Sequence, residues 1–204
     1  TIMEARINKS VQSVSAKFDE LVQLMQRRGY VSAWNLTDQG RTLARIFHEL
    51  DLVVAEALTD GLFDDLNPAE LASLLSTFVY EFRRAEDPPR PIIPTTLASR
   101  WKTLQALSNK IAQDEDSSGL SPHRSLDPGL MDVTFAWASG DELIDILNED
   151  LTAGDFVRTM KQLIDLLRQI SLVALLQETR DSALAASQAL LRGVVAASQG
   201  SVLQ

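Results

Sequence analysis

The sequence predicts an all-α fold, a multi-helix bundle preceded by a small unit made of one helix and a short hairpin. Apolar residues recur every three or four positions through most of the 204 residues, which is the spacing of one helix face. Residues that favour helix N-termini precede several of these segments, and the β-like pattern is confined to the first third. With 45% hydrophobic and 23% charged residues, a chain of this length can bury a core.

The first unit begins with a helix. Apolar side chains between Phe18 and Met25 lie at helical intervals, and Gly29 is placed to end that helix. Tyr30 to Leu36 is short and β-like, which predicts a small hairpin or wing. Trp34 lies in this wing, and its role as a core residue or a stacking residue stays open.

Thr37 is a suitable N-cap for the next helix. The apolar residues of that helix are Leu43, Ile46, Phe47 and Leu50. Asp51 to Leu58 either continues or restarts it, and Gly61 closes the unit.

Asn67-Pro68-Ala69-Glu70 is a strong helix start, because Asn caps, Pro suits the first helical position and Glu follows the cap by three residues. The apolar face that follows consists of Leu71, Leu74, Leu75, Phe78, Val79 and Phe82. Arg84 to Pro94 holds four of the seven prolines and must interrupt the helix. Helical spacing resumes from Leu97 to Ile111, and the acidic, Ser-rich segment Gln113 to Ser125 is predicted to be a mobile loop.

The last third is predicted to be helical throughout. The expected helices are Asp127 to Gly140, Asp141 to Asn148, Ala153 to about Gln177, and Asp181 to Ser198. Thr152 followed by Asp155 is a capping box at the start of the long third helix. The last helix is rich in alanine, and small side chains permit close packing.

The composition excludes several classes of function. A formal net charge of −9 argues against a free-standing DNA-binding domain, which usually presents a basic surface. The absence of cysteine excludes disulfides, Cys-ligated zinc, iron–sulfur clusters and thiol catalysis. The phosphate-binding motifs Gly-x-x-x-x-Gly-Lys-[Ser/Thr] and Gly-x-Gly-x-x-Gly are absent. No membrane-spanning run and no signal peptide is visible, which predicts a cytoplasmic protein.

No catalytic or metal-binding motif is visible either. The two histidines, His48 and His123, lie in neither a His-Glu-x-x-His nor a Glu-x-x-His arrangement. His48 is interpreted as a partly exposed structural residue, and His123 is given no role in its polar loop. No nucleophile elbow is present, so this chain by itself is not assigned an enzymatic activity.

The helix that begins at Ala153 carries a polar stripe beside its apolar face. Its members are Arg158, Lys161, Gln162, Asp165, Arg168 and Gln169. On an ordinary helix such a stripe is a solvated face. Alternatively it is a ledge that faces a polymer, with Arg158 and Lys161 neutralising phosphate and Gln162 touching a base edge or a ribose.

Glu81 is a second candidate because it follows a strongly apolar segment. It also precedes Arg83 and Arg84, and the simplest interpretation is an intrahelical ion pair near a helix C-terminus.

Several segments, in this order, resemble the DSHCT domain, the C-terminal helical domain of exosome-associated DExH RNA helicases in superfamily two. Leu58 to Glu81, which includes Gly-Leu-Phe-Asp-Asp-Leu-Asn-Pro-Ala-Glu, is similar to the entry motif of that family. Met131 to Gly140 resembles its Trp-containing helix, and Gly154 to Gln169 resembles its long helix. Leu191 to Ser198 is similar to its closing segment. The acidic, Arg-over-Lys character is most similar to the actinobacterial HelY-type branch.

The resemblance implies a chain of two parts, with residues 1–45 from the end of a winged-helix-like unit and residues 46–204 as the DSHCT-like bundle. It implies a C-terminal accessory domain of an ATP-dependent RNA helicase, which closes the strand channel and contacts single-stranded RNA, or DNA, through a ratchet-type helix. The matching positions assign nucleic-acid contacts to Glu81, Arg158, Lys161 and Gln162, and Gln162 departs from the Arg of relatives.

The resemblance also implies a partner, the RecA-like helicase core of the same parent chain. ATP and Mg would be bound there, and no cofactor or metal is assigned to this chain. The competing hypothesis is an acidic all-α protein-interaction module with no nucleic-acid role, which would dock through the loops at residues 84–96 and 112–127.

Overall fold

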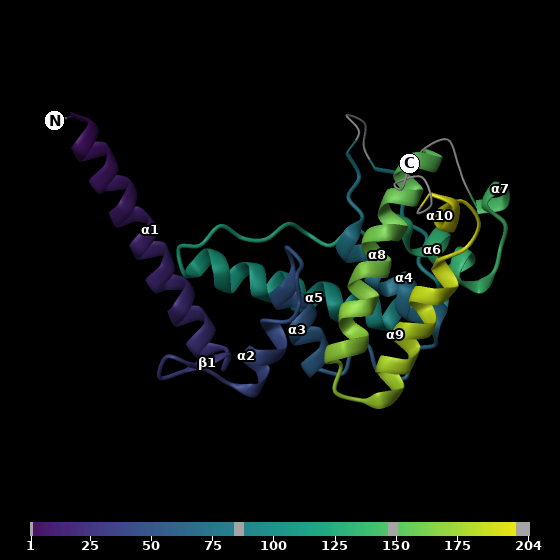
Figure 1. Cartoon of the computed structure of the whole chain (residues 1–204), viewed down its shortest axis with the longest axis horizontal. Coiled ribbons are helices and arrows are strands. Elements are labelled where there is room, and N and C mark those ends of the chain that lie inside the picture. Colours follow the sequence, from purple (N-terminus) through teal and green to yellow (C-terminus); the bar gives the residue numbers. More distant parts are fainter. Residues whose placement is uncertain (1, 84–87, 147–150, 199–204) are drawn as a thin grey trace.

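Helices account for most of the computed structural model, which describes residues 2–83, 88–146 and 151–198, with side chains from residue 14 onward. In Figure 1, α1 (Ile2–Arg27) projects away from a bundle whose near side is formed by α8 (Ala153–Val173) and α9 (Gln177–Leu190). The only strands among the described residues form one short hairpin. The predicted all-α multi-helix fold is therefore confirmed.

The amino-terminal unit is the expected helix and hairpin. α1 ends where Gly29 adopts a φ of +79° and the Tyr30 N–H donates to the Met25 carbonyl. β1 (Val31–Ser32) pairs antiparallel with β2 (Asn35–Leu36). The two turn residues between them, Ala33 and Trp34, both have positive φ, as a type I′ turn requires. Trp34 is 77% exposed at the tip and is not a core residue.

α2 (Asp38–Leu43) packs tightly against the hairpin. Thr37 caps it as predicted, because its side-chain oxygen accepts the Gly40 N–H at 3.1 Å. A Cβ at position 40 would lie 2.1 Å from the Tyr30 carbonyl oxygen, so only glycine fits there. Tyr30 is 2% exposed and belongs to the same buried cluster as the rest of the chain. The domain boundary at residue 45 stays a prediction.

The helix expected to carry Leu43 through Leu50 is shorter than predicted. α2 ends at Leu43, and α3 (Asp51–Thr59) starts anew after a non-helical segment, residues 44–50. One cause is local: the Leu50 N–H, which would bond to Ile46 in a helix, donates instead to Nδ1 of His48 at 3.0 Å. Ile46 and Leu50 still reach the core, whereas Phe47 is 80% exposed rather than on an inward face.

α4 (Pro68–Val79) is the most deeply buried helix. Its predicted capping box forms: Asn67 Oδ1 accepts the Glu70 N–H at 3.0 Å, and Glu70 accepts the Asn67 N–H at 3.1 Å. Every residue from Leu71 to Phe78 is buried. α4 packs on α6 (Met131–Ser139), α8 and α9. The helix ends before Phe82, because residues 80–83 leave it to run beside residues 124–127, where Asp127 accepts the Phe82 N–H at 2.8 Å.

α5 (Ala98–Ser117), preceded by the 3-10 turn η1 (Thr95–Leu97), is longer than predicted. The segment 113–117 is helical, and the helix stops only at Gly119, whose φ is +76° and beyond which the Leu120 N–H bonds to the Glu115 carbonyl. The loop predicted for Gln113 to Ser125 is therefore wrong for residues 113–117, which are helical. Residues 118–125 do form a loop, and His123 in it bonds to Glu115 of α5.

The carboxyl-terminal third differs from the prediction at its boundaries. The 3-10 turn η2 (Pro128–Leu130) leads into α6, which Gly140 ends at a φ of +111°, and α7 (Leu143–Ile146) follows. α8 ends at Val173, short of Gln177, because the chain turns there to place α9 beside α8. Ala183 and Ala186 are fully buried in that contact, as close packing requires. The expected last helix is divided into α9 and α10 (Gly193–Ala197) at Arg192, where the backbone is extended and the guanidinium stacks on Trp137 at 3.6 Å.

Within the described residues, no helix is both long and apolar enough to cross a lipid bilayer.

Arg28 fastens the amino-terminal unit to the bundle. It is 11% exposed, and its guanidinium lies 2.9 Å from Glu56 of α3 and 2.5 Å from Asp114 of α5. Arg28→Met should lower the free energy of unfolding by about 2 kcal/mol, because two carboxylates lose their shared cation in a largely buried setting. Urea denaturation measures the change.

The control is Arg168→Met, whose pair with Asp165 is exposed and 3.9 Å long. That change should cost less than about 1 kcal/mol. Equal small losses for the two variants would contradict the role given to Arg28.

Candidate functional site

A cleft of about 640 Å³ opens between three parts of the chain: residues 47–49, residues 78–83 at the end of α4, and one face of α8. Arg124 completes its lining. Three of the four residues proposed from the sequence, Glu81, Arg158 and Gln162, line this one cleft. The fold therefore brings together positions that lie about eighty residues apart in the chain.

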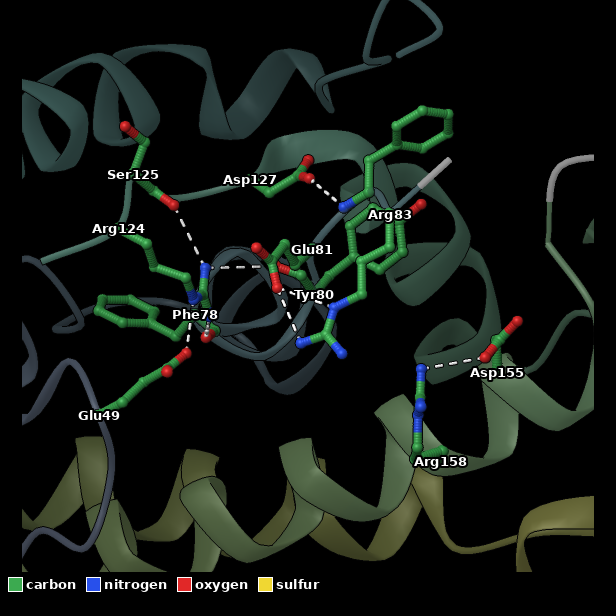
Figure 2. Close-up of polar contacts among 11 residues, drawn as sticks. Glu49, Phe78, Tyr80, Glu81, Arg83, Arg124, Ser125, Asp127, Asp155 and Arg158 are labelled. Carbon is green, nitrogen blue, oxygen red and sulfur yellow. Dashed lines mark hydrogen bonds and ion pairs between the residues drawn. The ribbon is translucent and has the colours of Figure 1, made fainter. Parts of the chain in front are cut away.

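The α8 side of the cleft is a single row of side chains. The row consists of Asp155, Arg158, Gln162, Asp165 and Gln169, which follow one another by three or four residues. Thr152 caps the helix by accepting the Asp155 N–H at 3.1 Å. Arg158 is 61% exposed and lies 3.0 Å from Asp155. Figure 2 shows Arg158 rising from α8 toward the side of the cleft that carries Glu81 and Arg83.

Lys161 lies outside this row. Its Nζ donates to the Ser198 carbonyl at the end of α10, at 3.1 Å, and it is not among the residues that line the cleft. Arg168 is likewise absent from the lining. The polar stripe predicted as one surface is thus divided between the cleft and the flank of α8, and the assignment of Lys161 stays a prediction.

Glu81 lies just after α4 rather than within it. Its carboxylate is 2.8 Å from Arg83, so the predicted ion pair forms, but it joins two residues of the extended segment and is not intrahelical. Its other predicted partner, Arg84, lies outside the described residues. The pair is well exposed, with Glu81 at 44% and Arg83 at 70%, and both groups remain accessible from the cleft.

Arg124 organises the inner wall, and the sequence did not single it out. Its Nε lies 2.5 Å from Glu49, while its other nitrogens donate to the carbonyls of Phe78 and, at 3.2 Å, of Ser125. Figure 2 shows these groups converging on the guanidinium from three segments. The hydrogen bond from Arg124 holds the pKa of Glu49 below its usual range. The partners are up to 75 residues away, so no local pattern could have identified this residue.

His48 forms the floor beside Glu49. Its ring meets that of Phe78 edge to face, with centroids 6.3 Å apart, and its Nδ1 accepts the Leu50 N–H. Burial lowers the pKa of His48, since the charged imidazolium would be poorly solvated there. The accepted N–H favours the same neutral form, because a protonated Nδ1 has no lone pair to offer.

A second polar cluster lies away from the cleft and has the connectivity of a catalytic triad. Ser108 bonds to Nε2 of His123 at 2.9 Å, and Nδ1 of His123 lies 2.7 Å from Glu115. Ser108 is only 3% exposed, however, and none of the three lines the cleft. With Ser108 buried, the hydrogen bonds of the cluster join residues 118–125 to α5. His123 therefore has a structural role, contrary to the prediction of none.

The charges of the cleft are nearly balanced. Its lining contains four carboxylates, on Glu49, Glu81, Asp155 and Asp165, against the three guanidiniums of Arg83, Arg124 and Arg158. Among the described residues, no group of three or more histidine, aspartate or glutamate side chains is arranged to hold a metal ion. Such a lining suits a ligand that offers hydrogen-bonding edges and flat apolar faces more than one that offers only negative charge.

Comparison with known proteins gives one consistent picture. The family model described as the DSHCT (NUC185) domain matches residues 33–198. The chain is 34% identical to the "Probable helicase HelY" of Mycobacterium tuberculosis over 97% of this chain and 24% of that protein. It is 29% identical to the human "Exosome RNA helicase MTR4" over 72% of this chain and 14% of the relative. The chain thus spans about a quarter of the length of the curated relatives that match most of it.

Replacing Arg124 tests its role as the clamp of the inner wall. Arg124→Lys should lower the free energy of unfolding by about 2 kcal/mol, because one ammonium cannot reach Glu49 and the carbonyls of α4 together. Urea denaturation measures this loss, and hydrogen exchange of residues 78–83 should become faster. Arg168→Lys, the same change at an exposed pair, should alter neither measurement. If the two variants behave alike, Arg124 does not hold the wall.

The buried, neutral state of His48 predicts a pH dependence of stability. Below about pH 6.5 the unfolded chain protonates this histidine, whereas the folded chain, with its lowered pKa, resists protonation. The free energy of unfolding should therefore fall as the pH decreases from 7.5 to 5.5, by at most about 1.4 kcal/mol per pH unit from this residue.

His48→Asn provides the comparison, because the amide oxygen can still accept the Leu50 N–H but does not titrate. Urea denaturation of both proteins at pH 7.5 and pH 5.5 should show a smaller loss in the variant. Equal losses in the two proteins would assign the effect to other groups.

Proposed function

This chain belongs to the DSHCT domain family, and we propose that it is the C-terminal accessory domain of an ATP-dependent RNA helicase. In this proposal the domain closes the channel through which the strand passes, and α8 contacts single-stranded RNA as the strand moves. The observation that carries the proposal is the cleft that sets Arg158 and Gln162 of α8 opposite Glu81. The names of the relatives support it, since they are helicases and include RNA helicases.

The chemistry of the cleft suits contacts that form and break repeatedly. Arg158 and Asp155 are more than half exposed, and an ion pair in that setting contributes about 0–1 kcal/mol. Arg158 can therefore exchange Asp155 for a phosphate at little cost. Gln162 offers both a donor and an acceptor to a base edge or to a ribose 2′-hydroxyl. Glu81 can accept from the amino group of a base.

The rest of the activity is proposed for the parent protein. ATP and Mg would bind in a RecA-like core of the same parent chain, and this core would be the intramolecular partner of the domain. No cofactor is proposed for the domain itself. The proposed location is the cytoplasm, and single-stranded DNA is the alternative polymer.

Substitutions in the intact parent helicase test the proposal. Arg158→Ala and Gln162→Ala should each reduce the stimulation of ATP hydrolysis by single-stranded RNA about tenfold, because each removes a contact of about 1–2 kcal/mol in a partly desolvated site. Hydrolysis without RNA and the melting temperature should stay unchanged, since both side chains are exposed. Arg168→Ala, on the same helix but outside the cleft, is the matched control.

Lys161→Ala separates the two faces of α8. If the strand lies in the cleft, Lys161→Ala should reduce the RNA stimulation of ATP hydrolysis less than Arg158→Ala does. The reason is that Lys161 bonds to Ser198 and does not face the cleft. If neither Arg158 nor Gln162 affects stimulation while the protein melts normally, the strand does not use this cleft. An acidic protein-interaction module would then be the better description.

A further inference from the structure

Phe47 is an aromatic side chain that the fold holds at the edge of the cleft and leaves uncovered. It lines the cleft and is nevertheless 80% exposed. Its neighbours Ile46 and Leu50 are 4% and 2% exposed, so the backbone on both sides is anchored in the core. The outward direction of Phe47 is therefore a consequence of a fixed backbone and not of a loose loop.

The backbone of Phe47 is also attached to α8. Its N–H donates to Oε1 of Gln169 at 2.6 Å, a contact between residues 122 positions apart. Gln169 belongs to the same row of α8 side chains as Arg158 and Gln162. Next to Phe47, His48 is packed against Phe78 and bonded to the Leu50 N–H. The backbone of Phe47 is consequently held beside the polar row, so its exposed side chain starts from a fixed position at the edge of the cleft.

The surroundings of Phe47 favour a nucleobase over a phosphate as its occupant. The lining carries four carboxylates against three guanidiniums, so it offers a phosphate no net attraction. The amides of Gln162 and Gln169 and the carboxylates present the hydrogen-bonding groups that read base edges. A flat aromatic face beside such groups is the arrangement that single-strand binding proteins use to stack bases.

We propose that Phe47 is a stacking platform for one base of a single strand lying along the polar row of α8. This inference rests on the proposed function and adds a contact made by ring stacking, which does not depend on charge or on base identity. The expected contribution to affinity is about tenfold, at the lower part of the range for one stacked base. Because every base has a π-face, the contact can be passed from one base to the next as the strand advances.

The test is the binding of fluorescein-labelled single strands to the purified chain at low ionic strength, followed by anisotropy. The two ligands are a 12-residue oligouridylate and a strand of equal length with abasic residues, which keeps every phosphate and removes every base. Phe47→Ala and Phe47→Leu should weaken oligouridylate binding about tenfold and leave abasic binding unchanged. Leu keeps the apolar bulk but removes the aromatic face.

Two further variants make the outcome specific. Phe47→Trp should keep the affinity for oligouridylate. Oligouridylate should also quench the tryptophan fluorescence of this variant more than it quenches that of the unsubstituted chain. Leu172→Ala is the matched control, since Leu172 is 66% exposed on α8 but does not line the cleft. All Phe47 variants should melt as the unsubstituted chain does, because the replaced side chain is mostly in water.

The results separate this inference from the proposed function. If Phe47→Ala behaves as Leu172→Ala does while Arg158→Ala weakens binding, the strand uses the cleft but does not stack on Phe47. If Phe47→Ala weakens both ligands equally, its role is structural and the stacking inference is wrong. If the unsubstituted chain binds neither ligand, the stacking inference is wrong, whereas the proposed function is judged by the ATP-hydrolysis measurement in the parent helicase.

Discussion

The cleft depends on how the most buried helix of the fold ends. α4 is covered over almost its whole length, so the carbonyls of its last turn are left without helix partners and largely without access to water. Two donors from the segment 124–127 bond to these carbonyls: Arg124 donates to the Phe78 carbonyl, and the Asp127 N–H donates to the Thr77 carbonyl. The same guanidinium also binds Glu49. The contacts that cap α4 therefore fix the positions of residues 47–49 and 124–127 as well.

The shape of the cleft also depends on which part of the α8 surface the neighbouring helices leave exposed. Its apolar face is buried against α4 and α9, and Lys161 on its flank reaches α10. Successive residues of a helix differ by about 100°, so positions 158, 162, 165 and 169 fall within a sector of about 60°, and position 161 lies about 40° beyond the edge of that sector. The polar surface of α8 that lines the cleft is therefore narrower than the sequence indicates, because neighbouring helices cover the rest.

The sequence was informative where the deciding contacts are local. The caps at Thr37 and Asn67 and the stop at Gly140 form as predicted, because each involves residues a few positions apart. Thr152 also caps its helix, but of the predicted capping box only the bond from the Asp155 N–H is present. Family resemblance placed Glu81, Arg158 and Gln162 on what proved to be a single cleft. Arg124 and the outward Phe47 were not predictable. Arg124 depends on carbonyls 44 and 46 residues away, and Phe47 lies in the non-helical segment 44–50, where the Leu50 N–H donates to His48 instead of continuing a helix.

The ion pairs that join segments of this domain are shielded from water, whereas the pair within the cleft is exposed. Arg28 and Arg124, which join segments, are 11% and 22% exposed, whereas Arg158, inside the cleft, is 61% exposed. Water screens the exposed pairs, so they resist exchange of partner only weakly, while the shielded ones hold the walls in place. In the proposed function, a lining with more carboxylates than guanidiniums would turn most phosphates of the strand toward solvent and its bases inward. In the proposed function, the shielded ion pairs would keep the walls rigid, and the exposed contacts would let the strand be held and released.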